Sequence, residues 1–311
     1  MIMIEESLNI AIENNATDIH LCPTATDFLV QYRISGKITQ LHANHVSKNA
    51  LNRLKMLSNL DLSETRRAQE GQFSFTHHKE DFFIRISIIN TKLGEKVALR
   101  ILPTGFKHSL GSINLPKSIH ENLIQSLLKP KGIIFVCGAT GAGKTTTLYS
   151  CLEYLNNGER TIFTIEDPVE FTIKEFYQCE LNPQIDITPQ YILKSLLRQD
   201  PDVIFIGELR DKETAELALM AAHTGHLVLT TIHTNSALEL FYRLQNWNID
   251  MFTLVSALNF VIHQKMTYQE GHRRPHFSGI APNWGNNLPD DYFSLINNKS
   301  IWEVFNDDGN A

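Results

Sequence analysis

The chain has 311 residues, of which 42% are hydrophobic and 20% charged, a composition that predicts a globular protein of about two domains. Its net charge of −6 argues against a protein whose main partner is nucleic acid, although a local basic patch stays open. No apolar run approaches the roughly 18 residues of a membrane-spanning helix, so any membrane contact is expected to be peripheral. The cysteines form no C-x-x-C pair, which argues against a zinc ribbon and favours a reducing, cytoplasmic location.

Residues 1–103 predict a small α/β domain whose strands are mostly antiparallel. Apolar residues recur at helical spacing in one segment and alternate with polar residues in others. The predicted elements are an amphipathic helix, a hairpin and two later strands, over residues 1–15, 28–40, 82–89 and 95–102. The next residues, 104–116, contain Pro, Gly and Ser and show little periodicity, so we interpret them as a linker.

Residues 117–270 predict a second α/β domain, built on a mostly parallel sheet with helices on both faces. Continuous apolar runs alternate with helical patterns, as in sheets whose strands are buried on both sides. The predicted strands lie at 132–137, 161–165, 203–206 and 227–232. The predicted helices lie at 145–155, 188–198, 212–223, 236–247 and 251–266. Residues 271–311 are rich in Pro, Asn, Asp and Gly, and we expect a loosely structured tail with one helix near 292–296.

A phosphate-binding motif follows the strand predicted at 132–137. The sequence GATGAGKT matches the P-loop pattern G-x-x-x-x-G-K-[ST] and is followed at once by a predicted helix, the context that the motif requires. Glycines let backbone N–H groups turn toward a phosphate, and the helix N-terminus adds positive potential. Lys144 supplies a charge for the β- and γ-phosphates, and Thr145 a hydroxyl for Mg²⁺. The predicted nucleotide-binding residues are Gly138, Ala139, Thr140, Gly141, Ala142, Gly143, Lys144 and Thr145.

Two predicted strands end in acidic residues. The strand at 203–206 is followed by Glu208, and the strand at 161–165 by Glu166. Because the carboxyl ends of parallel strands meet at one edge of a sheet, both acids are expected beside the P-loop, where they can orient water or hold Mg²⁺. The alternatives are a solvated strand-end glutamate at Glu208 and a structural turn at Glu166.

Two histidines flank the strand predicted at 227–232. They lie at opposite ends of it, so they cannot both reach one atom. His233, at the carboxyl end, is placed to sense a γ-phosphate, whereas His226 is at the other end. A lone histidine is more often a structural residue, so this alternative stays open for both, and neither resembles a metal ligand.

Four ordered segments together resemble the secretion ATPases of type II secretion, type IV pilus and competence-pseudopilus systems. Their Walker A, Asp box, Walker B and His box are similar to GATGAGKTTTLYS, TIEDPVE, LLRQDPDVIFIGELRD and TGHLVLTTIHTNSA. The resemblance extends to the amino-terminal domain through ATDIHLCP, YRISGKITQL and IRISIINTKLGEKVALRIL, and it covers about residues 8–266. It is closer to the assembly and export branch than to the pilus-retraction branch.

The resemblance implies a RecA-like P-loop ATPase domain preceded by a PAS-like domain, acting as a homo-hexamer with ATP and Mg²⁺. By position, Lys144, Glu208, Glu166 and His233 would be catalytic, and the metal would be held by Thr145, Glu166 and Glu208, partly through water. His226 would complete the His-box pair. Arginines of the first domain reach a nucleotide in this family, and the matching candidates are Arg33, Arg85 and Arg100.

Two departures from the family pattern bear on function. Where a P-Q-D-G-R segment is usual, the chain has AQEGQ, so Gln72 replaces an arginine that Arg66 or Arg67 would have to supply. The four-cysteine zinc insert common near the carboxyl end is missing, so no zinc is expected, and we expect no amino-terminal docking extension either. These features make the chain most similar to the competence ATPases of Gram-positive bacteria.

The function implied is an ATP-hydrolysing motor that drives pseudopilus assembly for DNA uptake by acting on a polytopic membrane platform protein from the cytoplasmic face. No direct contact with nucleic acid is expected. One alternative is a nucleic-acid translocase or type IV secretion motor. The other is a protein that binds ATP, turns it over little and acts by contact with partners.

Overall fold

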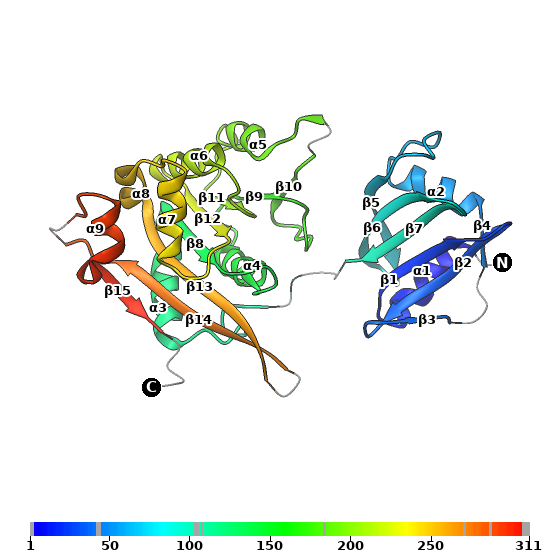
Figure 1. Cartoon of the computed structure of the whole chain (residues 1–311), viewed down its shortest axis with the longest axis horizontal. Coiled ribbons are helices and arrows are strands. Elements are labelled where there is room, and N and C mark those ends of the chain that lie inside the picture. The colour runs from blue at the N-terminus through cyan, green and yellow to red at the C-terminus, as the bar shows by residue number, and fades with distance from the viewer. Residues whose placement is uncertain are drawn as a thin grey trace. The chain divides into compact units, whose positions relative to one another are not determined.

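The computed structural model describes residues 3–41, 45–102, 106, 108–182, 185–269, 272–285 and 288–306. The chain divides into two compact units (Figure 1). The first contains Met1–Phe106 and Glu170–Thr172, and the second contains Lys107–Val169 and Ile173–Ala311. Part of the interpreted linker, residues 104, 105 and 107, lies outside the described residues. In the parts of the chain listed above, no helix is long and apolar enough to cross a bilayer.

The first unit is a single antiparallel sheet with two helices. Its strands run in the order β3-β2-β1-β7-β6-β5, and β4 also pairs with β2. The elements are α1 (Ile4–Glu13), β1 (Ala16–Pro23), β2 (Asp27–Ile34), β3 (Lys37–Thr39), β4 (His45–Ser47), α2 (Asn49–Leu57), β5 (Gln69–His77), β6 (Glu80–Thr91) and β7 (Gly94–Ile101). The antiparallel strands expected from the alternating pattern are therefore present.

One face of this first sheet is apolar and the other is polar. Strand residues that alternate inward, such as Ile19, Leu99 and Ile86, are fully buried together with Leu8 of α1 and Leu54 of α2. Since successive side chains of a strand point to opposite faces, the residues between them lie on the other side of the sheet. The helices thus cover the apolar face, and the polar face carries the charged side chains described below.

The second unit is built on an eight-stranded sheet of order β10-β9-β11-β12-β8-β13-β14-β15. Pairing is parallel from β10 to β13 and antiparallel from β13 to β15. The strands are β8 (Gly132–Cys137), β9 (Ile162–Glu166), β10 (Tyr177–Glu180), β11 (Val203–Ile206), β12 (Leu227–Ile232), β13 (Leu258–Gln269), β14 (His272–Pro282) and β15 (Trp302–Phe305). The helices are α3 (Lys117–Leu127), α4 (Lys144–Leu155), α5 (Pro189–Leu196), α6 (Lys212–His223), α7 (Glu239–Asn246), α8 (Met251–Ala257), α9 (Tyr292–Asn297) and the short 3₁₀ helix η2 (Lys299–Ile301).

The helix predicted at 251–266 is wrong beyond Ala257, because α8 ends there and β13 begins. Phe260, Val261 and Ile262 are fully buried, and this segment pairs in parallel with β8. A short continuous apolar run is equally compatible with a buried helix and a buried strand, so periodicity alone could not separate them.

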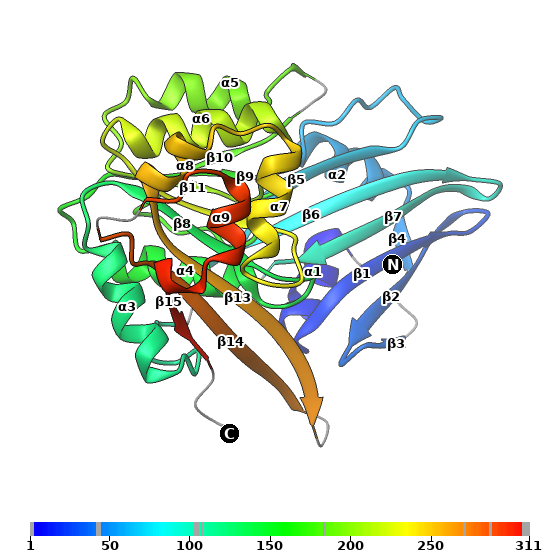
Figure 2. The same ribbon diagram turned by 60° about the vertical axis from the view of Figure 1, so that its left-hand side comes forward.

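The expectation of a loosely structured tail over 271–311 is also wrong for the described residues. β14 pairs with β13 from Val261 to Gln269, and the two form a long hairpin (Figures 1 and 2). Trp302 of β15 is buried and stacks on Phe241 of α7 with 5.0 Å between ring centroids. The predicted helix at 292–296 coincides with α9. Few apolar residues suffice to fix this region because they complete the core of the second unit.

Candidate functional site

The P-loop connects β8 to α4 and has the backbone that its glycines permit. Gly138, Gly141 and Gly143 have φ values of 148°, 78° and 88°, a region that other L-residues rarely adopt. A Cβ atom at Gly138 would lie 2.2 Å from the carbonyl oxygen of Gln264. A Cβ atom at Gly143 would lie 2.9 Å from Nε2 of the same glutamine. The β13 backbone therefore approaches the loop so closely that Gly138 is needed for space as well as for conformation, whereas Gly143 meets only the end of a side chain.

Lys144 is the first residue of α4 and lies within the loop. Its Nζ donates hydrogen bonds to the carbonyl oxygens of Gly138 and Ala139, each at 2.9 Å. Burial lowers the pKa of this ammonium, and the negative charge of Glu208 acts in the opposite direction. Thr145 follows at the next position of the first turn and is half-buried. A cation and a hydroxyl thus lie at a helix N-terminus, where anionic phosphate is favoured.

The two catalytic candidates at neighbouring strand ends are in direct contact. The Oε1 atom of Glu208, which follows β11, lies 3.0 Å from Nε2 of His233, which follows β12. The other ring nitrogen, Nδ1, is 3.4 Å from Nζ of Lys144. Arg210 then links Glu208 Oε2 to Asp167 Oδ2, with 2.9 Å in each contact. The carboxyl edge of the sheet therefore carries a continuous chain of charged and polar groups beginning in the P-loop.

The tautomer of His233 follows from its two partners. An ammonium can only donate a hydrogen bond, so Nδ1 facing Lys144 must accept, and Nε2 must carry the proton that is donated to Glu208. The histidine is thereby oriented between the P-loop lysine and the strand-end acid.

Glu166 at the end of β9 has different surroundings from Glu208. It is buried, its Oε1 accepts from Thr164 Oγ1 at 2.6 Å and from Gln178 Nε2 at 3.3 Å, and its Oε2 accepts from Tyr149 OH at 2.6 Å. These donors already engage both carboxylate oxygens, so Mg²⁺ fits here through intervening water rather than by direct ligation. The Thr145 hydroxyl fits a Mg²⁺–nucleotide substrate directly. Glu208 is more accessible than Glu166, but its two oxygens contact His233 and Arg210, so it too fits the metal through water.

Several residues of the site were not anticipated from the sequence. Gln264 of β13 is buried and accepts a hydrogen bond from Thr147 Oγ1 of α4 at 2.7 Å, so it supports the helix that begins at the P-loop. Tyr149, two residues further along α4, donates a hydrogen bond to Glu166. Arg210 was detectable because it comes two residues after Glu208 and strand-end acids attract a cation. Gln264 had no such signal, since its segment was interpreted as helix.

His226 does not join the site. Its Nδ1 lies 2.9 Å from the carbonyl oxygen of Ala221, near the end of α6, and its own carbonyl accepts from Gly132 N, where β8 begins. His226 therefore lies at the amino-terminal end of β12 and is a structural residue, as in the alternative considered for both histidines. His233 lies at the opposite end of the same strand, beside the P-loop.

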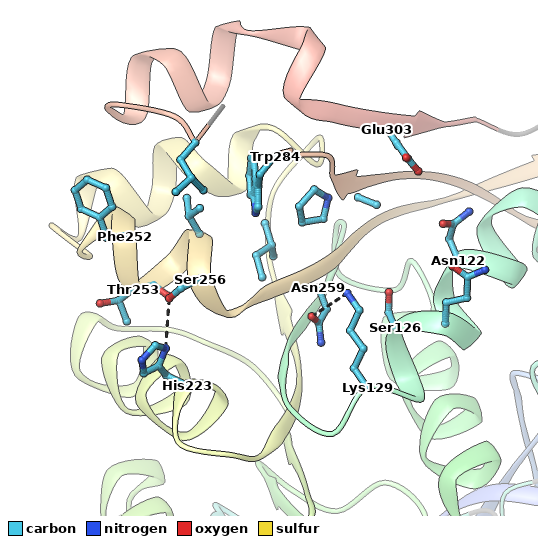
Figure 3. A pocket seen from close by; sticks show the side chains of 16 residues that line it. Asn122, Ser126, Lys129, His223, Phe252, Thr253, Ser256, Asn259, Trp284 and Glu303 are labelled. Atoms are coloured by element: carbon cyan, nitrogen blue, oxygen red, sulfur yellow. Dashed lines mark hydrogen bonds between the residues drawn. The ribbon is translucent and has the colours of Figure 1, made fainter. Parts of the chain in front are cut away.

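Two cavities differ in their relation to this edge. A cavity of about 520 Å³ is lined by Ala139 of the P-loop, by His233 and by residues of α7. Another, of about 770 Å³, is lined by residues of α3, α6, α8 and β14 and by the first residues of β13 and β15 (Figure 3). There, Lys129 Nζ points toward Asn259 Oδ1 at 3.3 Å, and Phe252 lies at the other end (Figure 3). Because this larger cavity lies where β13 begins, at the opposite edge of the parallel strands from the P-loop, it is remote from the nucleotide candidates.

The three candidate arginines of the first unit lie in one row across its sheet. Strand register places Gln72 of β5 opposite Arg85 of β6, Arg85 opposite Arg100 of β7, Arg100 opposite Asp18 of β1, and Asp18 opposite Arg33 of β2. Directly opposed residues share a face, so all five lie on the polar face of the sheet. We call this set the arginine row.

Asp18 is the acid of the arginine row and lies between Arg100 and Arg33. Arg100 Nε donates to its Oδ1 at 2.9 Å, and Arg33 Nε lies 3.7 Å from its Oδ2. Burial would raise the pKa of Asp18, but hydrogen bonds from Arg100 and Thr17 outweigh it, so the pKa lies below its ordinary value of 3.8.

The family pattern has an arginine at the position of Gln72, and neither Arg66 nor Arg67 takes its place within the arginine row. Arg66 and Arg67 precede β5, and their backbone N–H groups donate to Glu64 Oε1 at 2.7 and 3.1 Å. Neither residue belongs to the strand register that defines the row. Gln72 itself is exposed and stands at the end of the row, opposite Arg85.

Comparisons with known proteins place this geometry in context. The family described as type II/IV secretion system protein matches residues 1–279. The chain is 41% identical over 269 residues to "Protein transport protein HofB homolog" of Escherichia coli (strain K12), covering 85% of this chain and 58% of that protein. It is 37% identical over 267 residues to "Type II secretion system ATPase E" of Vibrio cholerae serotype O1, covering 85% and 53%. The chain thus spans little more than half the length of these curated relatives.

Solved structures show the same likeness. The chain is similar to the pilus retraction motor PilT with bound ADP, with a TM-score of 0.78 and 29% identity, covering 97% of this chain and 88% of that one.

Proposed function

Because the chain belongs to the type II/IV secretion system protein family, we propose that it is an ATPase motor that hydrolyses ATP to drive a secretion or pilus machine. In this proposal the second unit is the RecA-like ATPase domain, the first is the PAS-like domain, and residues 104–116 are the linker. The relatives named as a type II secretion ATPase and a pilus retraction motor support this reading of the family.

The observation that carries the proposal is the contact chain from Lys144 through His233 to Glu208. Lys144 binds the β- and γ-phosphates in place of the carbonyl oxygens that it now contacts. Glu208 orients the attacking water and accepts its proton, since one carboxylate oxygen faces His233 and the residue is not fully buried. His233 senses the γ-phosphate because it contacts both groups.

Mg²⁺ bound to the nucleotide substrate would offset the negative charge of its phosphates. Thr145 would hold it through its hydroxyl, and Glu208 and Glu166 would act through water. The burial of Glu166 and the donors on both of its oxygens support an indirect role, because direct ligation would compete with the hydrogen bonds from Tyr149 and Thr164.

Arg33, Arg85 and Arg100 complete the site from another subunit or domain in a homo-hexamer. Guanidinium groups stabilise charge that develops on the transferred phosphoryl group, and three of them lie on one sheet face. Motion of the first domain, coupled to nucleotide state, is passed to a polytopic platform protein at the cytoplasmic face of the membrane. In its most specific form, the proposal is that the motor drives assembly of a competence pseudopilus for DNA uptake.

A second candidate is a nucleotide-gated interaction protein that turns ATP over slowly. Gln72 favours it, because it puts a neutral side chain at one end of the arginine row. A motor and a slow switch differ in turnover rate, which is directly measurable.

The deciding experiment measures steady-state ATP turnover of the full chain and of Glu208→Gln. Loss of the base is expected to lower turnover by about 10² to 10⁴-fold. Glu216→Gln on α6, whose carboxylate is half exposed and pairs with Lys212, is the matched control and should keep the wild-type rate. Equal rates for wild type and Glu208→Gln would remove the hydrolytic assignment, and a wild-type monomer that stays monomeric with ATP would remove the ring.

A further inference from the structure

Three side chains with metal-ligand atoms converge where α1 ends beside the turn of the β5–β6 hairpin. They are Glu13, the last residue of α1, His77, the last residue of β5, and His78 in the turn. One ligand atom from each lies within 4.8 Å of the other two. This cluster is remote in sequence from the P-loop motif and uses none of the residues assigned above.

The orientation of His77 suits a metal ligand. Its Nδ1 lies 2.8 Å from Oδ1 of Asn9, one turn before Glu13 on α1. An amide oxygen only accepts, so Nδ1 carries the proton and the lone pair of Nε2 points the other way. This second interaction, which fixes the tautomer and ring orientation of a histidine, is typical of metal-binding histidines.

The Nε2 atom of His77 faces Glu13 at a distance that favours a shared ion. It lies 3.8 Å from Glu13 Oε1, which is too long for a hydrogen bond. Two ligands that each bind Zn²⁺ at about 2.0–2.2 Å in tetrahedral geometry are separated by about 3.4 Å. A small rotation of the half-exposed Glu13 side chain is enough to reach that separation.

The hairpin turn brings His78 to the same place. His78 and Lys79 have φ values of 48° and 70°, as in the two-residue turns that match the twist of a hairpin. The rings of His77 and His78 meet edge to face with centroids 4.2 Å apart, and Phe82 lies on His77 at 6.4 Å. His77 is therefore packed in place, while His78 and Glu13 are accessible to solvent.

We propose that Glu13, His77 and His78 form a binding site for a divalent transition-metal ion of the Zn²⁺ class. Two imidazoles and one carboxylate suit Zn²⁺, Ni²⁺ or Cu²⁺, whereas Mg²⁺ and Ca²⁺ prefer oxygen ligands alone. Three protein ligands leave a coordination position for water. In the sequence analysis no zinc was expected because the four-cysteine insert is missing. That expectation concerns a cysteine site and does not apply to a site made of two histidines and a glutamate.

Metal binding at this site would tie the end of α1 to the β5–β6 hairpin. The strands of that hairpin carry Gln72 and Arg85 of the arginine row. Because the ion binds only the folded unit, it raises the free energy of unfolding of that unit by mass action. The site is thus structural, and it restrains the part of the sheet that bears the row.

The test is a titration of the chelator-treated full chain with ZnCl₂, by calorimetry and by thermal unfolding. One ion per chain is expected, with a rise in the midpoint of unfolding, and MgCl₂ should reproduce neither. His78→Asn, which tolerates the positive φ, and Glu13→Gln each remove a ligand and should weaken binding at least about 10-fold. Asn9→Ala leaves all three ligands and should weaken it by about 10-fold through the orientation of His77.

His45→Ala is the matched control, because His45 is a half-exposed histidine of the same unit that pairs with Asp27. It should bind Zn²⁺ like the wild type. The proposal is overturned if His78→Asn and Glu13→Gln keep wild-type affinity, or if Mg²⁺ binds as tightly as Zn²⁺. The assay contains no ATP, so its outcome is independent of the proposed motor function.

Discussion

The two groups of candidate residues, at the P-loop edge and in the arginine row, differ in how they are held. At the P-loop edge, Glu166 is buried and has donors on both carboxylate oxygens, and Lys144 is buried among carbonyl oxygens. In the row, Arg100 is mostly exposed and contacts Asp18, which Arg33 also approaches. Glu166 and Lys144 of the first group are therefore fixed by burial, whereas the arginines of the second lie on an accessible face.

This difference matches the two roles in the proposed function. Groups that position phosphate and water gain from being rigid, because rearrangement during the reaction costs rate. Groups that reach a nucleotide from another body have to leave one partner for another. Asp18 offers the arginines a carboxylate, which has the same hydrogen-bonding geometry toward guanidinium as a phosphate. Variants can therefore test whether the P-loop edge has to be rigid and whether the arginines of the row exchange Asp18 for a phosphate.

The largest effect is expected from Gly138→Ala, which changes a residue of the rigid P-loop edge. The new Cβ would meet the Gln264 carbonyl oxygen at 2.2 Å, and φ at this position is 148°. We expect a loss of about 2–4 kcal/mol in the free energy of unfolding together with loss of nucleotide binding. Urea unfolding and fluorescent-nucleotide titration measure the two.

Gly141→Ala is the control for that experiment. Its φ is 78°, but a Cβ there has no atom within 4 Å, so only the backbone strain of about 1 kcal/mol remains. If Gly138→Ala proved no more destabilising than Gly141→Ala, the close approach of β13 to the P-loop would be refuted.

Arg100→Ala tests the accessible group. If the arginine row completes the site of another subunit, turnover should fall about 10³-fold while the second unit keeps its own nucleotide contacts. Arg100→Lys keeps the charge beside Asp18 but not the planar fork, so an intermediate rate is expected. Arg53→Ala, an exposed arginine on α2 that pairs with Glu5, should keep the wild-type rate. Wild-type turnover in Arg100→Ala would exclude this residue from the site.

The sequence predicted the P-loop edge better than the row because its signals are local. A strand, a glycine-rich turn and a helix follow one another within GATGAGKT, and Glu208 and His233 each come just after an apolar strand. The order of the strands then brings these ends together. Gln264 escaped notice because its partner in packing, Gly138, is far away in sequence and its strand resembles a buried helix.

The arginine row depends on pairings that no local pattern contains. The family resemblance supplied Arg33, Arg85 and Arg100 as separate candidates, but only strand register shows that they share one face with Asp18. A shift of one residue in any strand would move its arginine to the apolar face. The tail was missed for a similar reason, since Trp302 is ordered by contacts with α7 rather than by its own segment.

A smaller effect is expected from Tyr149→Phe, which removes one donor from the rigid group. Tyr149 OH donates to buried Glu166 Oε2 at 2.6 Å, and its loss leaves a carboxylate oxygen without that partner. We expect the free energy of unfolding to fall by about 1–3 kcal/mol. Tyr154→Phe, on the same helix and 42% exposed, controls for the change in residue type and should cost far less. Equal costs for the two variants would contradict the view that Glu166 is held in place by burial and hydrogen bonds.

The smallest effect is expected from Asp18→Asn and appears in its pH dependence. The folded pKa of Asp18 lies below 3.8, so the ionised carboxylate stabilises the first unit above that pH, and this contribution is lost as pH falls through the folded pKa. The difference in urea midpoint between wild type and Asp18→Asn should therefore be full at neutral pH and shrink as the pH falls below 3.8. Asp81→Asn, an exposed acid of β6 that accepts from Thr76, is the matched control and measures what any surface carboxylate of this sheet contributes. A difference that stays constant through the acid range would mean that Asp18 is not held by charge, and the arginines would then need no exchange of partners to reach a phosphate.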